Sequence, residues 1–218
     1  MKEFGKQLRE NSLTLVVTLM LLAALAGQAV AGLAAYNEQA KTAGLAEITL
    51  GRYLTSSSFA VDVAENWQSE YLQFTLFILL TVWLVQRGSS ETKAPGEEGL
   101  ESPPEEAGGD KQYETPVFGL RRSPISLTVT MAVIFFGSWA AQAVTGNVAL
   151  NEERLRDLLD PLSLGQYLVH PDFWSRTLQN WQSELLAVGS MAIFTVFLRQ
   201  KGSPESKPVN APDEDNAG

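Results

Sequence analysis

The segment Asn-Trp-Gln-Ser-Glu occurs twice, at residues 66–70 and 180–184, each time at the start of a long apolar stretch. The asparagine and glutamate of each copy are four residues apart, so in a helix they share one face. A carboxylate that enters a membrane is a candidate for holding a proton or a cation. If Glu70 and Glu184 meet on an axis between the two copies, the pair forms such a site.

A structural explanation of the motif competes with this one, and we favour it. Trp67 and Trp181 are expected near the outer headgroup level of a bilayer, where the amphipathic indole ring is stable. The polar side chains would then lock the second helix of each unit against the first, through interhelical hydrogen bonds of about 1 kcal/mol each. The candidate polar cluster comprises Gln28, Asn66, Glu70, Gln142, Asn180 and Glu184.

Four apolar stretches must position these residues, and the charged residues are concentrated between them. A spanning helix needs about 20 predominantly apolar residues. The stretch at 71–85 has about fifteen, or about 22 Å of helix, so its span must include the turn that carries the motif. We therefore expect transmembrane helices at about residues 12–35, 67–86, 125–148 and 181–199.

The second half of the chain repeats the first without an insertion. Residue n aligns with residue n+114, and about thirty of about eighty aligned positions are identical. Because two helices return the chain to its starting side, the two units run parallel. We predict an all-α, polytopic membrane protein with four transmembrane helices, in which the first two-helix repeat covers residues 1–88, a disordered acidic linker 89–116, the second repeat 117–202 and a disordered tail 203–218.

The distribution of lysine and arginine predicts the orientation. Cations flank the N-terminus, the linker and the C-terminus, while the two loops within the units carry fewer for their length. By the positive-inside rule, both termini and the linker are cytoplasmic. The N-terminal stretch also imitates a secretory signal with a cleavage site at Ala29-Val30-Ala31. A near copy of that stretch begins at Ser126, where no signal peptide can be, so we favour a retained helix.

Small residues recur at every fourth position on the first helix of each unit, a pattern that lets helices approach closely. The predicted packing seam comprises Ala23, Gly27, Ala31, Gly137, Ala141 and Thr145. Each second helix is expected to end with a cation in its last turn followed by glycine, at Arg87-Gly88 and Lys201-Gly202. Aromatic loop residues are expected to join the tryptophans at the headgroup level: Tyr53, Phe59, Tyr167, Phe173 and Trp174.

Several kinds of chemistry are excluded by composition. The chain has no cysteine and one histidine, so thiolate and imidazole-rich metal sites are excluded. No phosphate-binding glycine loop and no hydrolase motif occurs. We expect no enzyme and no catalytic, cofactor-binding or metal site. His170 is interpreted as a turn residue, and Ser58 as a candidate helix cap.

These motifs resemble a family of uncharacterised bacterial membrane proteins, known as a domain of unknown function. The resemblance covers nearly the whole chain and is carried by LREN at 8–11, GQAVAG at 27–32, YNEQ at 36–39, LGRYL at 50–54, ENWQSEYLQ at 65–73, QNWQSE at 179–184 and LRQKGSPESKPV at 198–209. It implies an integral protein of the bacterial inner membrane with two copies of one unit, and it brings no reaction, ligand or site.

Three functions stay open at this point. We favour a membrane scaffold or interaction protein, whose partners are the lipid bilayer and either further copies of the chain or another membrane protein, with no nucleic acid. The second is a small transporter or a proton- or cation-coupled channel that uses the membrane-edge glutamates. The third is a membrane sensor subunit that signals through the acidic linker.

Overall fold

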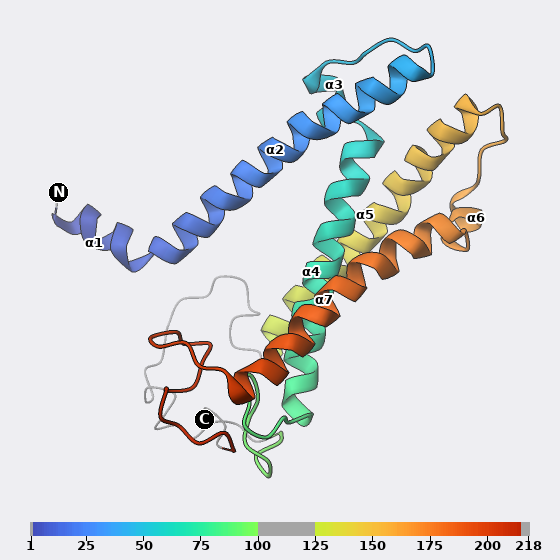
Figure 1. The fold of residues 1–218 in the computed structure, drawn as a ribbon. Helices are drawn as coiled ribbons and strands as arrows, with labels where there is room; N and C mark the ends of the chain where they lie inside the picture. Colours follow the sequence, from blue (N-terminus) through green and yellow to red (C-terminus); the bar gives the residue numbers. More distant parts are fainter. Residues whose placement is uncertain (1, 100–124, 215–218) are drawn as a thin grey trace.

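The computed structural model describes residues 2–99 and 125–214, and all regular structure in these residues is helical (Figure 1). The elements are α1 (Lys2–Glu10), α2 (Ser12–Thr42), α3 (Leu50–Leu54), α4 (Ser57–Trp83), α5 (Ser126–Arg156), α6 (Leu164–Leu168) and α7 (Pro171–Phe197). The bounds of α5, α6 and α7 equal those of α2, α3 and α4 plus 114. We call α2–α4 unit 1 and α5–α7 unit 2. The all-α prediction is confirmed for the described residues.

Two of the long helices stand out by their composition. α2 and α5 have 31 residues each and are long and apolar enough to cross a membrane. Of the helices in residues 2–99 and 125–214, these are the two that meet that description. α4 and α7 have 27 residues each, but their first turns are polar, which shortens the apolar part.

α4 begins ten residues before the span predicted at 67–86. Its first residue is Ser57, because the side chain of Ser56 caps the helix: Oγ accepts a hydrogen bond from the backbone N–H of Phe59 at 3.2 Å. The cap is therefore Ser56, and the candidate Ser58 was wrong by two residues. The repeated motif consequently lies in the middle of a helix and not at its start.

α7 shows the same early start. It begins at Pro171, which is well suited to a first helical position because it has no N–H to satisfy. The preceding residue, His170, has extended backbone angles, and its Nδ1 accepts a hydrogen bond from the N–H of Asp172 at 3.2 Å. The lone histidine is thus the N-cap of α7, a more specific role than that of a turn residue.

The helices end earlier than predicted. α4 ends at Trp83 and α7 at Phe197, and neither has a cation in its last turn. The chain leaves each helix in an extended conformation before it reaches the basic residue. Gly88 and Gly202 do adopt positive φ angles, of 80° and 82°, but they do so in a separate turn beyond the helix.

The segments after α4 and α7 contain turns without helix in their described parts. Arg199 forms an ion pair with Asp213 at 2.8 Å. The side chain of Lys207 is buried and donates hydrogen bonds to the carbonyls of Pro212 and Asp213, at 3.3 and 3.1 Å. The tail therefore folds back on itself as far as residue 214. Residues 100–116 of the predicted linker and 215–218 of the predicted tail lie outside the described residues.

An asparagine closes the loop after the long first helix in both units. The side chain of Asn37 accepts a hydrogen bond from the N–H of Ile48 at 2.9 Å and donates one to its carbonyl at 3.0 Å. Asn151 makes the same two bonds with Leu162, at 2.7 and 2.9 Å. Because an amide side chain offers both a donor and an acceptor, one residue satisfies both backbone groups and fixes the turn.

Each short helix then places a tyrosine against a glycine of the preceding long helix. A Cβ at Gly32 would overlap the hydroxyl of Tyr53, and one at Gly146 would overlap that of Tyr167. Both tyrosines are buried inside the protein, as is Phe173. The three rings are therefore enclosed by the protein, the two tyrosines in the space that the glycines leave, and their depth at the headgroup level stays a prediction.

The predicted small-residue seam is not a packing surface within this chain. A Cβ at Gly27 or Gly137 would meet no atom within 4 Å, and Ala23, Ala31 and Ala141 are exposed. Thr145 bonds the carbonyl of Ala141 in its own helix at 2.7 Å. The close approach uses the glycine five residues after Gly27, about 140° further round the helix. The seam was therefore wrong as an interface inside the monomer.

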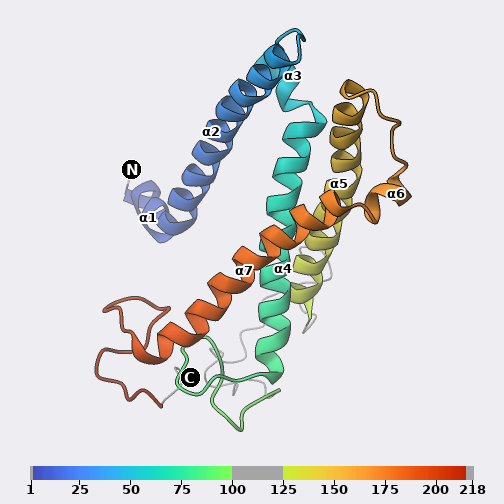
Figure 2. The same cartoon turned by 45° about the vertical axis from the view of Figure 1, so that its right-hand side comes forward.

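The long helices do not form a symmetric bundle. α4 packs along α5 in an antiparallel manner and crosses α7, whereas α2 leans away from the other three (Figures 1 and 2). α2 stays close to the other helices only towards its C-terminal end. Its first half is exposed on every side, so that residues 13–22 offer a continuous apolar surface.

Replacing Gly146 with alanine should destabilise the fold. The new Cβ would overlap the Tyr167 hydroxyl and lie 3.2 Å from Cγ2 of Val61, and overpacking costs about 1–3 kcal/mol. Gly137→Ala in the same helix is the control, because its Cβ meets open space and alanine favours a helix by about 0.5–1 kcal/mol. Thermal unfolding of both variants in detergent, followed by circular dichroism, tests this. Equal melting temperatures would contradict the tyrosine–glycine contact.

Candidate functional site

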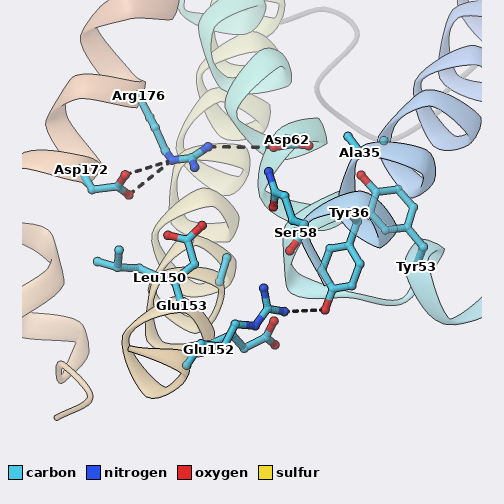
Figure 3. A pocket seen from close by; sticks show the side chains of 15 residues that line it. Ala35, Tyr36, Tyr53, Ser58, Asp62, Leu150, Glu152, Glu153, Asp172 and Arg176 are labelled. Atoms are coloured by element: carbon cyan, nitrogen blue, oxygen red, sulfur yellow. Dashed lines mark hydrogen bonds and ion pairs between the residues drawn. The ribbon is translucent and has the colours of Figure 1, made fainter. Parts of the chain in front are cut away.

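A cavity of about 240 Å³ lies where α2, α4, α5 and α7 converge (Figure 3). We call it the inter-unit cavity, because most of its lining comes from equivalent positions of unit 1 and unit 2. The equivalent pairs are Gly32 and Gly146, Ala35 and Ala149, Tyr36 and Leu150, Gln39 and Glu153, Ser58 and Asp172, and Asp62 and Arg176. The cavity therefore lies between matching parts of the two units.

Arg176 on α7 is held by three carboxylates at this cavity. Its guanidinium lies 3.3 Å from Glu65 and 3.9 Å from Asp62, both on α4, and 3.3 Å from Asp172 one turn earlier on α7. Figure 3 shows Arg176 between Asp172 and Asp62. Since Asp62 and Arg176 are equivalent positions, the repeat carries an anion in one unit and a cation in the other. This carboxylate–arginine cluster joins unit 1 to unit 2.

Two further contacts connect the units beside the cluster. The guanidinium of Arg156 donates to the hydroxyl of Tyr36 at 2.9 Å, and its central carbon lies 5.4 Å from the centre of the tyrosine ring. The hydroxyl of Ser57 donates to Glu152 at 3.0 Å. Tyr36 has a leucine at the equivalent position of unit 2, so this link has no counterpart across the axis.

The electrostatics of the cluster reflect partial burial. Burial raises the pKa of Glu65 above its usual range, and the nearby charge of Arg176 opposes that rise. The pKa of Asp62 is raised for the same reason and opposed by the same arginine. Burial also raises the pKa of the Tyr167 hydroxyl, which donates to Asp172 at 3.2 Å. The ionised carboxylates therefore retain a net cost of dehydration that the arginine offsets only in part.

The lining sets what the cavity can accept. It holds four carboxylates and two arginines, the carboxylates being Asp62, Glu152, Glu153 and Asp172. A negative excess of this kind favours small cations or zwitterions over anions. In the described part of the chain, no group of three or more acidic or histidine side chains has the arrangement of a metal site. The charge of the lining therefore favours a cationic or zwitterionic occupant.

The predicted asparagine–glutamate pairs do not form in the described structure. The amide of Asn66 donates to the backbone carbonyl of Asp62 at 2.7 Å, and that of Asn180 donates to the carbonyl of Arg176 at 3.0 Å. Both asparagines therefore bond the preceding turn of their own helix. They do not reach another helix, and the proposed lock between the helices of a unit does not depend on them.

The two glutamines of the predicted cluster differ from each other. Gln142 is buried, and its Nε2 donates to Oγ1 of Thr177 on α7 at 3.3 Å. Gln28 is half-buried and makes no hydrogen bond with its side chain among the described residues. Its unit has Val63 at the position equivalent to Thr177, so the acceptor is missing. The expected interhelical bond thus forms in unit 2 alone.

The tryptophans of the motif also differ. The indole N–H of Trp181 donates to Oε1 of the buried Gln68 at 2.8 Å, so this ring is attached to α4. Trp67 is 46% exposed, as a membrane-surface anchor would be. Gln68 was not among the predicted site residues, although it lies in the repeated motif beside Trp67.

The two glutamates of the motif lie near each other. Glu184 is next to the Ser69 hydroxyl and close enough to Glu70 for their charges to interact. Glu70 is exposed and Glu184 half-buried. The two carboxylates that the sequence singled out, one on α4 and one on α7, are therefore near enough to repel each other electrostatically. The predicted cluster of six is otherwise divided among separate contacts.

The carboxylate–arginine cluster was missed in the sequence. Asp62 and Glu65 were not among the predicted site residues. A usable signal was present, because positions 62 and 176 are equivalent in the repeat and carry opposite charges. Where two copies of a unit meet on an axis, equivalent positions face each other, so a change of charge sign between them indicates a contact.

Replacing Arg176 with glutamine should destabilise the fold by about 1–2 kcal/mol, a value discounted for partial solvent exposure. The loss follows because Glu65, with 16% of its side chain exposed, loses its counter-charge. Arg52→Gln is the matched control, since Arg52 is exposed and forms no ion pair in the described part of the chain. Unfolding in mixed micelles by SDS titration measures both. An unchanged unfolding free energy for Arg176→Gln would refute the inter-unit role of the cluster.

The raised pKa of Glu65 predicts how stability depends on pH. As the pH rises from the ordinary value of 4.5, the unfolded chain loses this proton first, so stability falls until the folded group also ionises. Glu65→Gln removes this part of the slope and should stabilise the protein at neutral pH. Gln7→Ala on α1 is the control, because it changes no titrating group. A Glu65→Gln variant with the wild-type slope would contradict the assignment.

Comparison with known proteins adds one finding. No curated protein and no solved structure matches the chain. A family model described as "Domain of unknown function (DUF6766)" matches residues 4–218, a range that includes both units and the whole lining of the inter-unit cavity. The predicted resemblance to a domain of unknown function is confirmed. The chain therefore belongs to this family of unknown function.

Proposed function

We propose that the chain is a four-span protein of the bacterial inner membrane that acts as a scaffold or interaction subunit, without catalytic activity, cofactor or nucleic-acid partner. The tandem arrangement is supported by the equal offset of 114 between the helix bounds of the two units. α2 and α5 supply two spans by length and composition. The proposal adds α4 and α7 as the other two.

The dimensions of α4 and α7 support that addition. A helix of 27 residues is about 40 Å long, more than the hydrocarbon thickness of about 30 Å. The apolar part alone is shorter than this thickness, so the span must include the turn that carries the repeated motif, while the polar first turns extend beyond the membrane on the far side. Those first turns carry the carboxylate–arginine cluster, which thus lies at the membrane surface opposite the termini. The positive-inside rule makes that surface the extracytoplasmic one.

The position of α2 is the observation that carries the proposed role. The polar side chains at the inter-unit cavity are largely engaged with one another, whereas residues 13–22 of α2 contact little of the rest of the described chain. Helices that pack in a membrane do so through van der Waals contact and a few polar bonds. A spanning helix that is free of its own bundle is available to a protein partner.

The test of this function is the assembly state of the full chain. Extraction into nanodiscs, followed by native mass spectrometry, should show species heavier than the 23.8 kDa monomer. Replacing Val17 and Leu21 with alanine removes apolar contact area from the exposed half of α2 and should shift the distribution towards the monomer. Leu72→Ala does not test the same surface, because Leu72 is buried and its replacement would destabilise the fold itself. A chain that is monomeric at all concentrations would overturn the scaffold proposal.

A second candidate function rests on the proximity of Glu70 and Glu184. Two carboxylates that share a site at a membrane edge can hold one proton or a cation between them, and this arrangement supports a small proton- or cation-coupled channel or transporter. Proteoliposomes with the wild type should then show an ion flux that the double variant Glu70→Gln, Glu184→Gln loses. Asn66→Ala is the control, because Asn66 bonds only its own helix. Equal flux in all three samples would remove this candidate.

A further inference from the structure

Equivalent faces of α4 and α7 have opposite environments. On α4, Ala64 and Leu72 are 8% and 7% exposed, in a stripe that also contains Val61 and Gln68. The equivalent residues of α7 are Leu178 and Leu186, which are 52% and 68% exposed. The stripe on α7 also includes Ser175 and Gln182, both exposed. We call these surfaces the α4 stripe and the α7 stripe. The α4 stripe is covered by the rest of the chain, whereas the equivalent α7 stripe is exposed.

α5 of unit 2 covers the α4 stripe. A Cβ at Gly146 would lie 3.2 Å from Val61, and the Ser57 hydroxyl bonds Glu152 at 3.0 Å. Because α4 and α5 are antiparallel, the position eleven residues after Val61, Leu72, lies opposite the position eleven residues before Gly146, Phe135. The covering face of α5 is therefore the stripe that runs from Phe135 to Gly146.

The helix equivalent to α5 is α2, and its corresponding stripe runs from Leu21 to Gly32. By the same register, Leu21 would lie opposite Leu186, as Phe135 lies opposite Leu72. Leu21 is 50% exposed whereas Phe135 is 5% exposed. In the described structure α2 does not pack along α7 as α5 packs along α4. The chain thus carries both halves of a second interface, the α7 stripe and the α2 stripe, and leaves them apart.

Polar groups in the stripes support protein as the cover. Gln68 lies in the α4 stripe and Gln142 on the face of α5 that covers it, and within the described residues each retains one unpartnered buried atom, the donor Nε2 of Gln68 and the acceptor Oε1 of Gln142. The equivalent residues are Gln182 in the α7 stripe and Gln28 in the α2 stripe. An amide directed at hydrocarbon costs several kcal/mol unless it is bonded. A surface that contains Gln182 is therefore better suited to a helix with its own amide than to lipid.

We infer that the α7 stripe is covered by α2 of a second copy of the chain, in the register in which α5 covers α4. Because α2 leans away from its own α7, α2 of each copy can pack against α7 of the other copy. The two contacts are then equal, since a two-fold axis relates the two copies. A second copy is the proposed partner because α4 and α5 already make, within one chain, the contact that α7 and α2 would make between two chains. This inference rests on the proposed interaction function and identifies its partner.

The absence of cysteine in the sequence permits a direct test. Leu21→Cys with one affinity tag and Leu186→Cys with another are coexpressed as full chains, and native membranes are treated with a short bismaleimide. Both positions are exposed, so neither change disturbs the core. We expect a crosslinked species that carries both tags. In the control, cysteine replaces Leu22 in place of Leu21. Leu22 is 57% exposed but points about 100° away around the helix, so this pair should give several-fold less crosslinked product.

The alternatives give different products. If a chain with both Leu21→Cys and Leu186→Cys crosslinks only within itself, and the mixed single variants do not link, α2 closes onto its own α7 and the inference is overturned. If neither sample links, these stripes face lipid and the inference fails as well. Native mass spectrometry then separates the two proposals: heavier species without this crosslink would leave the scaffold function in place and reject only the interface.

Discussion

Two copies of one unit can meet on an axis only if the positions that face each other differ in chemistry where charges are involved. Identical carboxylates at positions 62 and 176 would repel each other at the centre of the cavity. The exchange of Asp62 for Arg176 turns that repulsion into an ion pair, to which Glu65 and Asp172 add further carboxylates. The arrangement of α4 against α7, and hence of unit 1 against unit 2, depends on this asymmetry within an otherwise repeated fold.

Local sequence patterns predicted the elements better than they predicted the contacts. The offset of 114 residues between the two halves of the sequence predicts that the helices of the two units have equivalent bounds. Long apolar runs predict α2 and α5. The predicted spans begin ten residues after the helices do, because hydropathy does not detect the polar first turns that Ser56 and His170 cap. The caps depend on single side-chain bonds, which composition does not reveal.

The site was harder to predict for a similar reason. A small-residue seam was recognised on α2 and α5, but the glycines that are used, Gly32 and Gly146, lie on another face and receive tyrosines from the short helices. The motif glutamates do approach each other, whereas the asparagines beside them bond their own helices. The tyrosines come from the short helices and Glu184 comes from the other unit, and the periodicity of a single helix contains no information about such distant contacts.

The asparagine and tyrosine ties within each unit have a consequence for biosynthesis. They connect residues that are about ten to twenty positions apart, so the loop and short helix of unit 1 can form as soon as that part of the chain leaves the ribosome. The contacts between the units, by contrast, must await residues more than ninety positions further on. The turn of each unit can therefore close from local contacts alone, before the other unit is in place.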